Sequence, residues 1–141
     1  MREILFRGKR VNDGEWVEGF YAYIEFDDRH VIITQDTYTE YGGLYYFTAD
    51  PATIGQYTGL TDKNGKRIFE GDVVRFTERH LGGEDVPVVE AVEFAEGGFA
   101  THRYFLNNWL RNAAKENCQL QDIKVVGNIH DNPELLEGGE G

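Results

Sequence analysis

Cysteine is almost absent from this sequence, and proline and long apolar runs are scarce. The 141 residues contain one cysteine, Cys118, so no disulfide can form within one chain and no cage of several cysteines can hold zinc. Three prolines against seventeen glycines argue against a proline-rich linker and favour many turns between short strands. No run approaches the ~20 apolar residues of a membrane span, and residues 1–9 lack the apolar stretch of a signal peptide. We therefore expect a soluble, cytoplasmic protein with no membrane contact.

Basic residues are also few, since 14 Lys and Arg stand against 25 Asp and Glu, giving a net charge of −11. The acidic excess lies in residues 12–60 (net −8) and 81–141 (net −7), whereas residues 1–11 and 61–80 are slightly basic. Such a field disfavours general binding to a phosphate backbone, which needs a basic footprint. The ordinary explanation of the acidity is solubility.

Aromatic residues are plentiful, with nine Phe, eight Tyr and two Trp in a chain that is 40% hydrophobic. That content can supply a core and excludes a disordered chain. The length fits one domain or two small, closely packed halves.

The N-terminal part predicts a meander of short strands separated by turns. Strands are expected at Arg2–Phe6, Trp16–Phe26 and His30–Thr34, with turns at Asn12–Gly14 and Asp27–Arg29. Aromatic and β-branched residues favour a pleated surface in these segments.

Two aromatic stretches in this part could serve recognition. Residues 20–24 are apolar on both faces of the strand, so one face is expected to pack on a sheet or on another subunit. This predicts a homo-oligomer. Four tyrosines crowd around Gly42-Gly43, at Tyr38, Tyr41, Tyr45 and Tyr46. They either form a recognition surface or pack along a strand pair, and the sequence leaves both open.

The segment from Tyr57 to Phe76, called the signature segment below, has the clearest local pattern. Asn64-Gly65 predicts a hairpin with a type I′ turn, which needs positive φ at both residues. Gly71-Asp72 predicts a second corner, and Val73–Thr77 predicts an apolar strand. A hairpin, a corner and a strand in close succession suggest bent antiparallel sheets with an SH3-like or OB-like small barrel core around residues 54–129.

The remaining C-terminal part predicts more strands and one short helix. Strands are expected at Val88–Phe94, Phe99–His102 and Ile123–Ile129, and the helix at Tyr104–Glu116, where apolar residues recur every four positions. An Asx cap and Pro133 predict a further helix start at 131–135. The fold class is therefore mainly β, as one domain over residues 1–136. Within it, an N-terminal meander (1–50) packs on a barrel-like half (51–136), with the joint near Asp50-Pro51. Residues 137–141 are expected to be a disordered tail.

Four blocks of this sequence resemble the YopX family of phage and prophage proteins. The longest is YTGLTDKNGKRIFEGDVV at residues 57–74, and GNIHDNPELL follows at 127–136. FRGK at 6–9 and WVEG at 16–19 resemble the family's opening. The resemblance implies a mostly β fold, carriage on a phage or prophage in a bacterial host, and no established activity or catalytic residue.

No constellation of side chains predicts catalysis, a cofactor or a metal. Paired carboxylates occur at Asp27-Asp28, at Glu84-Asp85 and at Glu70 with Asp72, but 25 acidic residues produce such pairs by chance. The sequence also lacks phosphate-cradling and nucleophile-elbow motifs. Cys118 has no feature of an activated thiol. The four histidines show no metal-ligand spacing; they are His30, His80, His102 and His130. We expect a protein that is not an enzyme and uses no cofactor.

Three functions remain open. The first is a non-enzymatic binding or assembly module acting as a homo-oligomer, with an unidentified host or phage macromolecule as partner. The second is an acidic protein that imitates nucleic acid to interfere with a host system. In the third, the barrel itself binds nucleic acid through basic side chains and stacking rings. The acidic net charge disfavours this third function. The residues of that third site would be Lys63, Lys66, Arg67, Arg75 and Arg79, with Tyr57 and Phe69.

Overall fold

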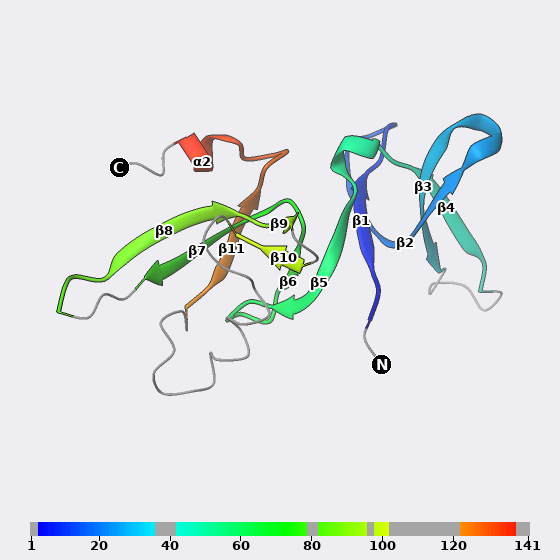
Figure 1. Cartoon of the computed structure of the whole chain (residues 1–141). Coiled ribbons are helices and arrows are strands. Elements are labelled where there is room, and N and C mark those ends of the chain that lie inside the picture. Colours follow the sequence, from blue (N-terminus) through cyan, green and yellow to red (C-terminus); the bar gives the residue numbers. More distant parts are fainter. Residues whose placement is uncertain (1–2, 36–41, 79–81, 96–97, 102–121, 138–141) are drawn as a thin grey trace. The chain divides into compact units, whose positions relative to one another are not determined.

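The protein is mainly β in a computed structural model that describes residues 3–35, 42–78, 82–95, 98–101 and 122–137 (Figure 1). This confirms the predicted fold class. The chain divides into two compact units, Met1–Tyr57 and Thr58–Gly141, called the N-terminal unit and the C-terminal unit below. The prediction of a single domain over 1–136 with a joint near residue 50 stays a prediction.

The N-terminal unit is an antiparallel sheet in the order β4-β3-β2-β1-β5. Its strands are β1 (Phe6–Lys9), β2 (Trp16–Ile24), β3 (Arg29–Gln35), β4 (Leu44–Thr48) and β5 (Gly55–Thr61), which runs on into the C-terminal unit. Two 3₁₀ turns, η1 (Glu25–Asp27) and η2 (Pro51–Thr53), lie between strands. The expected meander of β2 and β3 is therefore present.

Strand ends differ from the expected ones for local reasons. The first strand lies at Phe6–Lys9 instead of Arg2–Phe6, because its partner on β2 runs from Gly19 opposite Phe6 to Trp16 opposite Lys9. The second strand ends at Ile24, since η1 follows and Asp28 takes the left-handed conformation (φ 51°) that closes the hairpin. Asp tolerates that conformation better than most residues.

Two glycines allow neighbouring residues to approach closely at the centre of this sheet. A Cβ at Gly19 would meet the backbone carbonyl oxygen of Ile33 on β3, so no side chain fits there. A Cβ at Gly8 would lie 3.0 Å from the Cβ of Ala49. The two residues at the middle of β3, Val31 and Ile32, are fully buried.

The C-terminal unit contains a three-stranded antiparallel sheet in the order β11-β7-β8, a two-stranded hairpin of β10 and β9, and β6 beside β5 (Figure 1). The strand bounds are β6 (Arg67–Phe69), β7 (Asp72–Glu78), β8 (Val86–Ala91), β9 (Glu93–Ala95), β10 (Gly98–Ala100) and β11 (Lys124–Asn128). The core consists of buried residues from several of these strands and their links: Ile68, Val74, Phe76, Val92 and Ile123. In the described residues these sheets do not close into a barrel.

The hairpin of the signature segment forms at the predicted place with a different turn. Among the described residues other than glycine, only Asp28 has a positive φ, so Asn64 does not take the conformation of a type I′ turn. Gly65 does (φ 81°), its N–H donates to the carbonyl of Asp62, and the Asp62 N–H donates to the carbonyl of Lys66. This is the pattern of a three-residue loop in which a type I turn is followed by a left-handed glycine. Asp62 favours it because aspartate is preferred at the first position of a type I turn.

Residues 127–136, the C-terminal block of the family resemblance, form a turn held by asparagine side chains. The Asn128 side-chain oxygen accepts from the N–H groups of His130 (3.0 Å) and Asp131 (2.9 Å), and the Asn132 side-chain oxygen accepts from the N–H of Asn128 (3.3 Å). A Cβ at Gly127 would lie 2.5 Å from the Asn132 oxygen, so the turn packs directly on the backbone. The predicted helix start is confirmed as α2 (Glu134–Glu137) after Pro133. The helix expected at 104–116 and residues 138–141 lie outside the described residues.

Candidate functional site

The carboxylates of the signature segment act on the backbone. Asp62 is buried, and its side chain accepts from the N–H groups of Asn64, Lys66 and Val125, each at 2.9 Å. Burial by itself raises the pKa of Asp62, but these three N–H groups together lower it below its usual value. One carboxylate thus joins the hairpin loop to β11, and it is not available to a ligand.

Asp72 and Asp122 are used in the same way. Asp72, which is fully buried, accepts from the N–H of Phe69 at 2.7 Å and holds the corner after β6. Asp122 accepts from both the N–H (2.9 Å) and the hydroxyl (2.6 Å) of Thr77 on β7. Burial raises the pKa of Asp122, but hydrogen bonds, with the two from Thr77 contributing most, and the charge of Lys63 together bring the pKa below its usual value. Asp72 of the predicted Glu70/Asp72 pair is thus accounted for by the fold.

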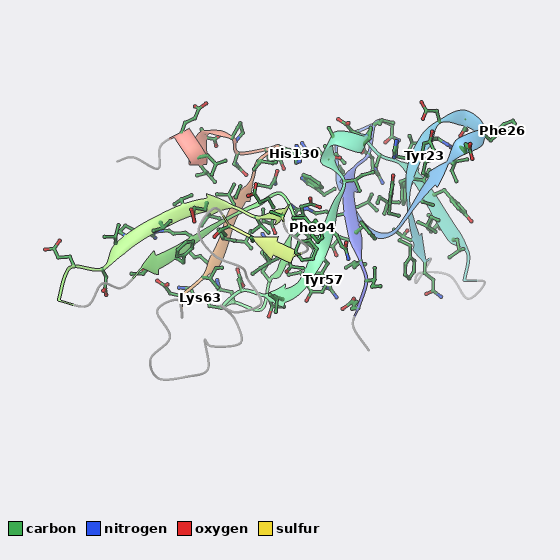
Figure 2. The ribbon with its side chains drawn as sticks, in the orientation of Figure 1. Tyr23, Phe26, Tyr57, Lys63, Phe94 and His130 are labelled. Atoms are coloured by element: carbon green, nitrogen blue, oxygen red, sulfur yellow. The ribbon has the colours of Figure 1, made fainter. Side chains whose placement is uncertain are left out.

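The stacking rings considered for nucleic acid are inside the protein. Tyr57 and Phe69 are both buried, so neither can stack on a base. The associated basic side chains are exposed where described: Lys63, Lys66, Arg67 and Arg75, with Arg79 outside the described residues. Figure 2 shows Tyr57 and Lys63 in place on the ribbon.

The two described histidines belong to different units of the chain. His30 lies on β3 of the N-terminal unit, and His130 lies in the C-terminal turn of the other unit. His80, His102 and Cys118 lie outside the described residues. Over the described ranges no three His, Cys, Asp or Glu side chains are arranged to hold a metal ion.

Exposed apolar side chains gather on the N-terminal unit. On its strands, Phe20 is 66% exposed, Tyr46 59% and Leu44 57%. The full set of large exposed apolar residues in this unit is Ile4, Val11, Phe20, Tyr23, Phe26, Leu44, Tyr45 and Tyr46. Of the predicted tyrosine cluster, Tyr45 and Tyr46 therefore lie on a strand pair and are still exposed, while Tyr38 and Tyr41 lie outside the described residues.

Three of these strands carry one continuous apolar row. Phe20 on β2 pairs with Ile33 on β3, and Ile33 pairs with Tyr46 on β4. Directly paired residues of neighbouring strands lie on the same face, so the three side chains stand side by side. We call Phe20, Ile33 and Tyr46 the apolar row.

The tip of the β2–β3 hairpin presents a phenylalanine among acidic residues. Phe26 in η1 is 98% exposed and points away from the sheet (Figure 2). The tip is held by Tyr23, whose hydroxyl donates to Asp28 at 2.5 Å, and by an ion pair between Asp27 and Arg29 at 3.3 Å. The predicted Asp27-Asp28 pair is thus part of a turn. Sequence reasoning took Phe26 as a strand residue and missed its exposure, although an aromatic between acidic residues at a turn was a visible signal.

The face of the sheet opposite the apolar row carries an aromatic cluster that the sequence did not indicate. The Tyr21 hydroxyl lies 2.6 Å from the Nδ1 of His30, and the two rings are parallel. Phe6 contacts Tyr21 (5.6 Å between ring centroids), and Tyr23 contacts His30 (4.9 Å). Only the strand register could have indicated this cluster. Tyr21 and Tyr23 lie on the same face of β2, and His30 of β3 is paired with Tyr23. The hydroxyl of Tyr21 occupies one ring nitrogen of His30, and the carboxylate of Asp28 accepts from the hydroxyl of Tyr23 in the same cluster.

These features define a protein of small antiparallel sheets in which Asp62, Asp72 and Asp122 bond to backbone N–H groups and several aromatic side chains of the N-terminal unit are exposed. The chain matches the family described as YopX protein over residues 5–137, and it belongs to that family. It is similar in fold to the crystal structure of protein EF1440 from Enterococcus faecalis, with 22% identity and a TM-score of 0.56, covering 96% of this chain and 99% of the other. Among curated proteins none matches. Within the described residues no helix is long and apolar enough to cross a membrane.

Proposed function

We propose that this YopX-family protein is a non-enzymatic binding or assembly module that acts as a homo-oligomer. It is encoded by a phage or prophage, works in the cytoplasm of the bacterial host, and uses no cofactor. The observation that carries the proposal is the apolar row, in which Phe20 and Tyr46 leave more than half of their surface in solvent. Contiguous exposed apolar side chains, rimmed by polar residues, are characteristic of interaction surfaces.

The distribution of polar groups supports a binding role over catalysis. Three carboxylates that could serve as acids or bases, Asp62, Asp72 and Asp122, are bonded to backbone N–H groups. Aromatic residues, in contrast, are the residue type most enriched at the centres of protein interfaces.

Imitation of nucleic acid is the less supported alternative. It requires a continuous band of carboxylates at the surface. Asp62 and Asp72 are buried, and the carboxylates at the β2–β3 tip share their surface with Phe26 and Arg29. Direct nucleic-acid binding by the signature segment has still less support, because the two proposed stacking rings, Tyr57 and Phe69, are buried.

Sedimentation across a range of micromolar concentrations tests the proposal. We expect the wild-type chain to sediment above the mass of one 16.1 kDa chain. Phe20→Ser should lower the mass or raise the concentration needed for association. Phe94→Ser is the matched control, because Phe94 is a similarly exposed phenylalanine (57%) in the C-terminal unit. A wild-type chain that stays monomeric throughout would refute homo-oligomerisation.

A further inference from the structure

The strand β4 is an edge strand whose outer side is covered, among the described residues, at its C-terminal end alone, where Arg10 bridges Ala49 and the N–H of Val11 donates to the carbonyl of Thr48. It ends the strand order of its sheet, and its five residues, Leu44 to Thr48, include no charge and no proline. Its pairing with β3 is continuous, with no bulge. Natural edge strands are normally blunted by charge, proline, a bulge or a covering element. An uncharged, aromatic edge strand is therefore a template for another strand.

The alternation of hydrogen bonds along β4 shows which of its backbone N–H and C=O groups point away from β3. The Ala49 N–H donates inward to the carbonyl of His30, so by antiparallel alternation Phe47 and Tyr45 also bond inward to β3. Tyr46 and Leu44 then direct their N–H and C=O groups to the outer edge. Thr48 follows the same alternation, because its carbonyl points outward and accepts from the N–H of Val11 (3.0 Å). In the described residues no strand pairs with this edge from Leu44 to Phe47.

We propose that β4 pairs antiparallel with β4 of a second copy of the chain, about a two-fold axis at Tyr46. This inference rests on the proposed homo-oligomer and specifies its interface. In this register Tyr46 faces Tyr46 of the other copy, and Tyr45 faces Phe47. The paired stretch is Tyr45 to Phe47, because Leu44 would face Thr48, whose outward carbonyl already accepts from the N–H of Val11. The apolar row of each copy then continues into the other, so that six apolar side chains stand in line on one face.

The absence of charged residues from β4 favours a second copy of the chain as the strand that pairs with it. Two molecules that each carry a net charge of −11 repel one another wherever carboxylates meet. β4 is uncharged, and so are the five β3 residues paired with it, Val31 to Gln35. This surface can therefore meet its own copy without placing like charges opposite each other.

A register-specific disulfide trap tests the pairing in the full-length chain with Cys118→Ser as background. Directly opposed residues in such a pair have their Cα atoms about 5.5 Å apart, within the span of a disulfide. Tyr46→Cys should therefore form a covalent dimer under mild oxidation. Tyr45→Cys is the matched control and should not, because Tyr45 of one copy faces Phe47 of the other. Tyr45→Cys combined with Phe47→Cys should restore cross-linking.

A second variant covers the case in which the cysteine perturbs the edge. Tyr46→Lys, an edge-protecting change, should reduce the sedimenting mass of the assembly by breaking the β4 contact, while Phe26→Lys at the hairpin tip should leave it unchanged. Cross-linking that is equal at positions 45 and 46, or a Tyr46→Lys variant with wild-type mass, overturns the β4 interface while homo-oligomerisation stands. A monomeric wild type overturns both.

Discussion

The side chains of the two units have different roles: those of the C-terminal unit stabilise the fold, and several of the N-terminal unit are exposed to solvent. In the C-terminal unit, Phe76 and Ile68 are buried in a common core, and the carboxylate of Asp62 is bonded to three backbone N–H groups. In the N-terminal unit, Phe20 and Tyr46 face solvent although they lie on paired strands. The most patterned segment of the chain stabilises the fold, and the less patterned one offers the surface.

The difference has a physical origin in how each unit satisfies its backbone. Turns with carboxylate or asparagine acceptors need specific residues at specific positions, which produces a recognisable sequence block. An exposed aromatic row needs only the right register and a suitable residue type. The first kind of requirement leaves a clear pattern in a sequence, and the second leaves a weak one.

The largest contrast is expected between a buried and an exposed phenylalanine. Phe76→Ala should lower the free energy of unfolding by about 3–5 kcal/mol, because it empties part of the core around Ile68 and Val74. Phe20→Ala should change it by about 0.5 kcal/mol or less. Urea unfolding, measured at low protein concentration by circular dichroism, gives both values. Equal losses would mean that the N-terminal unit depends on Phe20 for folding, and the contrast between the units would fail.

The next largest effect concerns backbone approach in the N-terminal unit. Gly19→Ala should lower the free energy of unfolding by about 1–3 kcal/mol, since the new methyl group meets the Ile33 carbonyl and must push β3 away. Gly43→Ala is the control, because a Cβ there has no neighbour within 4 Å and φ is not positive. It should be neutral or slightly stabilising. Thermal unfolding distinguishes the two variants, and a Gly19→Ala midpoint at the wild-type value would contradict the close approach.

A pH-dependent effect is expected in the C-terminal unit. The pKa of Asp62 is lower in the folded chain than in the unfolded one, so its contribution to stability is present above the unfolded value of about 3.9 and is lost as pH falls through the folded value. Asp62→Asn should cost about 1–3 kcal/mol near neutral pH, because the carboxylate that accepts three backbone N–H groups is lost.

The acid dependence provides the control for that prediction. In Asp62→Asn the decline of stability on the acid side should be shallower than in wild type, with the remaining slope including Asp122, whose pKa is lowered as well. Asp85→Asn, in the exposed loop before β8, should leave both the neutral stability and the slope unchanged. Urea midpoints at a series of acidic pH values measure this; an unchanged slope in Asp62→Asn would contradict the bonding of Asp62.

The sequence predicted the parts of this fold that depend on local chemistry. Asn64-Gly65 located the hairpin, Pro133 located the last helix, and alternation in Val73–Thr77 located β7. The turn type was wrong because the Asp62 side chain competes for the turn's N–H groups, which a two-residue Asn-Gly rule does not include. The described sheets do not close into the predicted barrel, because sheet closure depends on long-range strand pairing that no local sequence pattern records.

The candidate surface was predicted only in part. Residues 20–24 were expected to need a partner, and the exposure of Phe20 agrees with that need. The apolar row combines three strands, and its members become neighbours only through the registers of β2 with β3 and β3 with β4. Register is a tertiary property, so Ile33 and Tyr46 could not be joined to Phe20 from sequence spacing alone.

The smallest expected effect lies at the hairpin tip of the N-terminal unit. The hydroxyl of Tyr23 donates to Asp28, and this bond, with lesser contributions from desolvation and from the negative charge of Asp28, raises the pKa of Tyr23. Asp28→Asn should lower that pKa toward the ordinary tyrosine value, because the amide acceptor carries no charge. Asparagine also tolerates the left-handed conformation of residue 28, so the turn is retained. An NMR titration of the Tyr23 ring at alkaline pH measures the change, with Glu25→Gln as a neighbouring charge control that should have little effect. If the two variants titrate alike, Asp28 does not hold the tyrosine proton, and the tip is less ordered than the turns of the C-terminal unit.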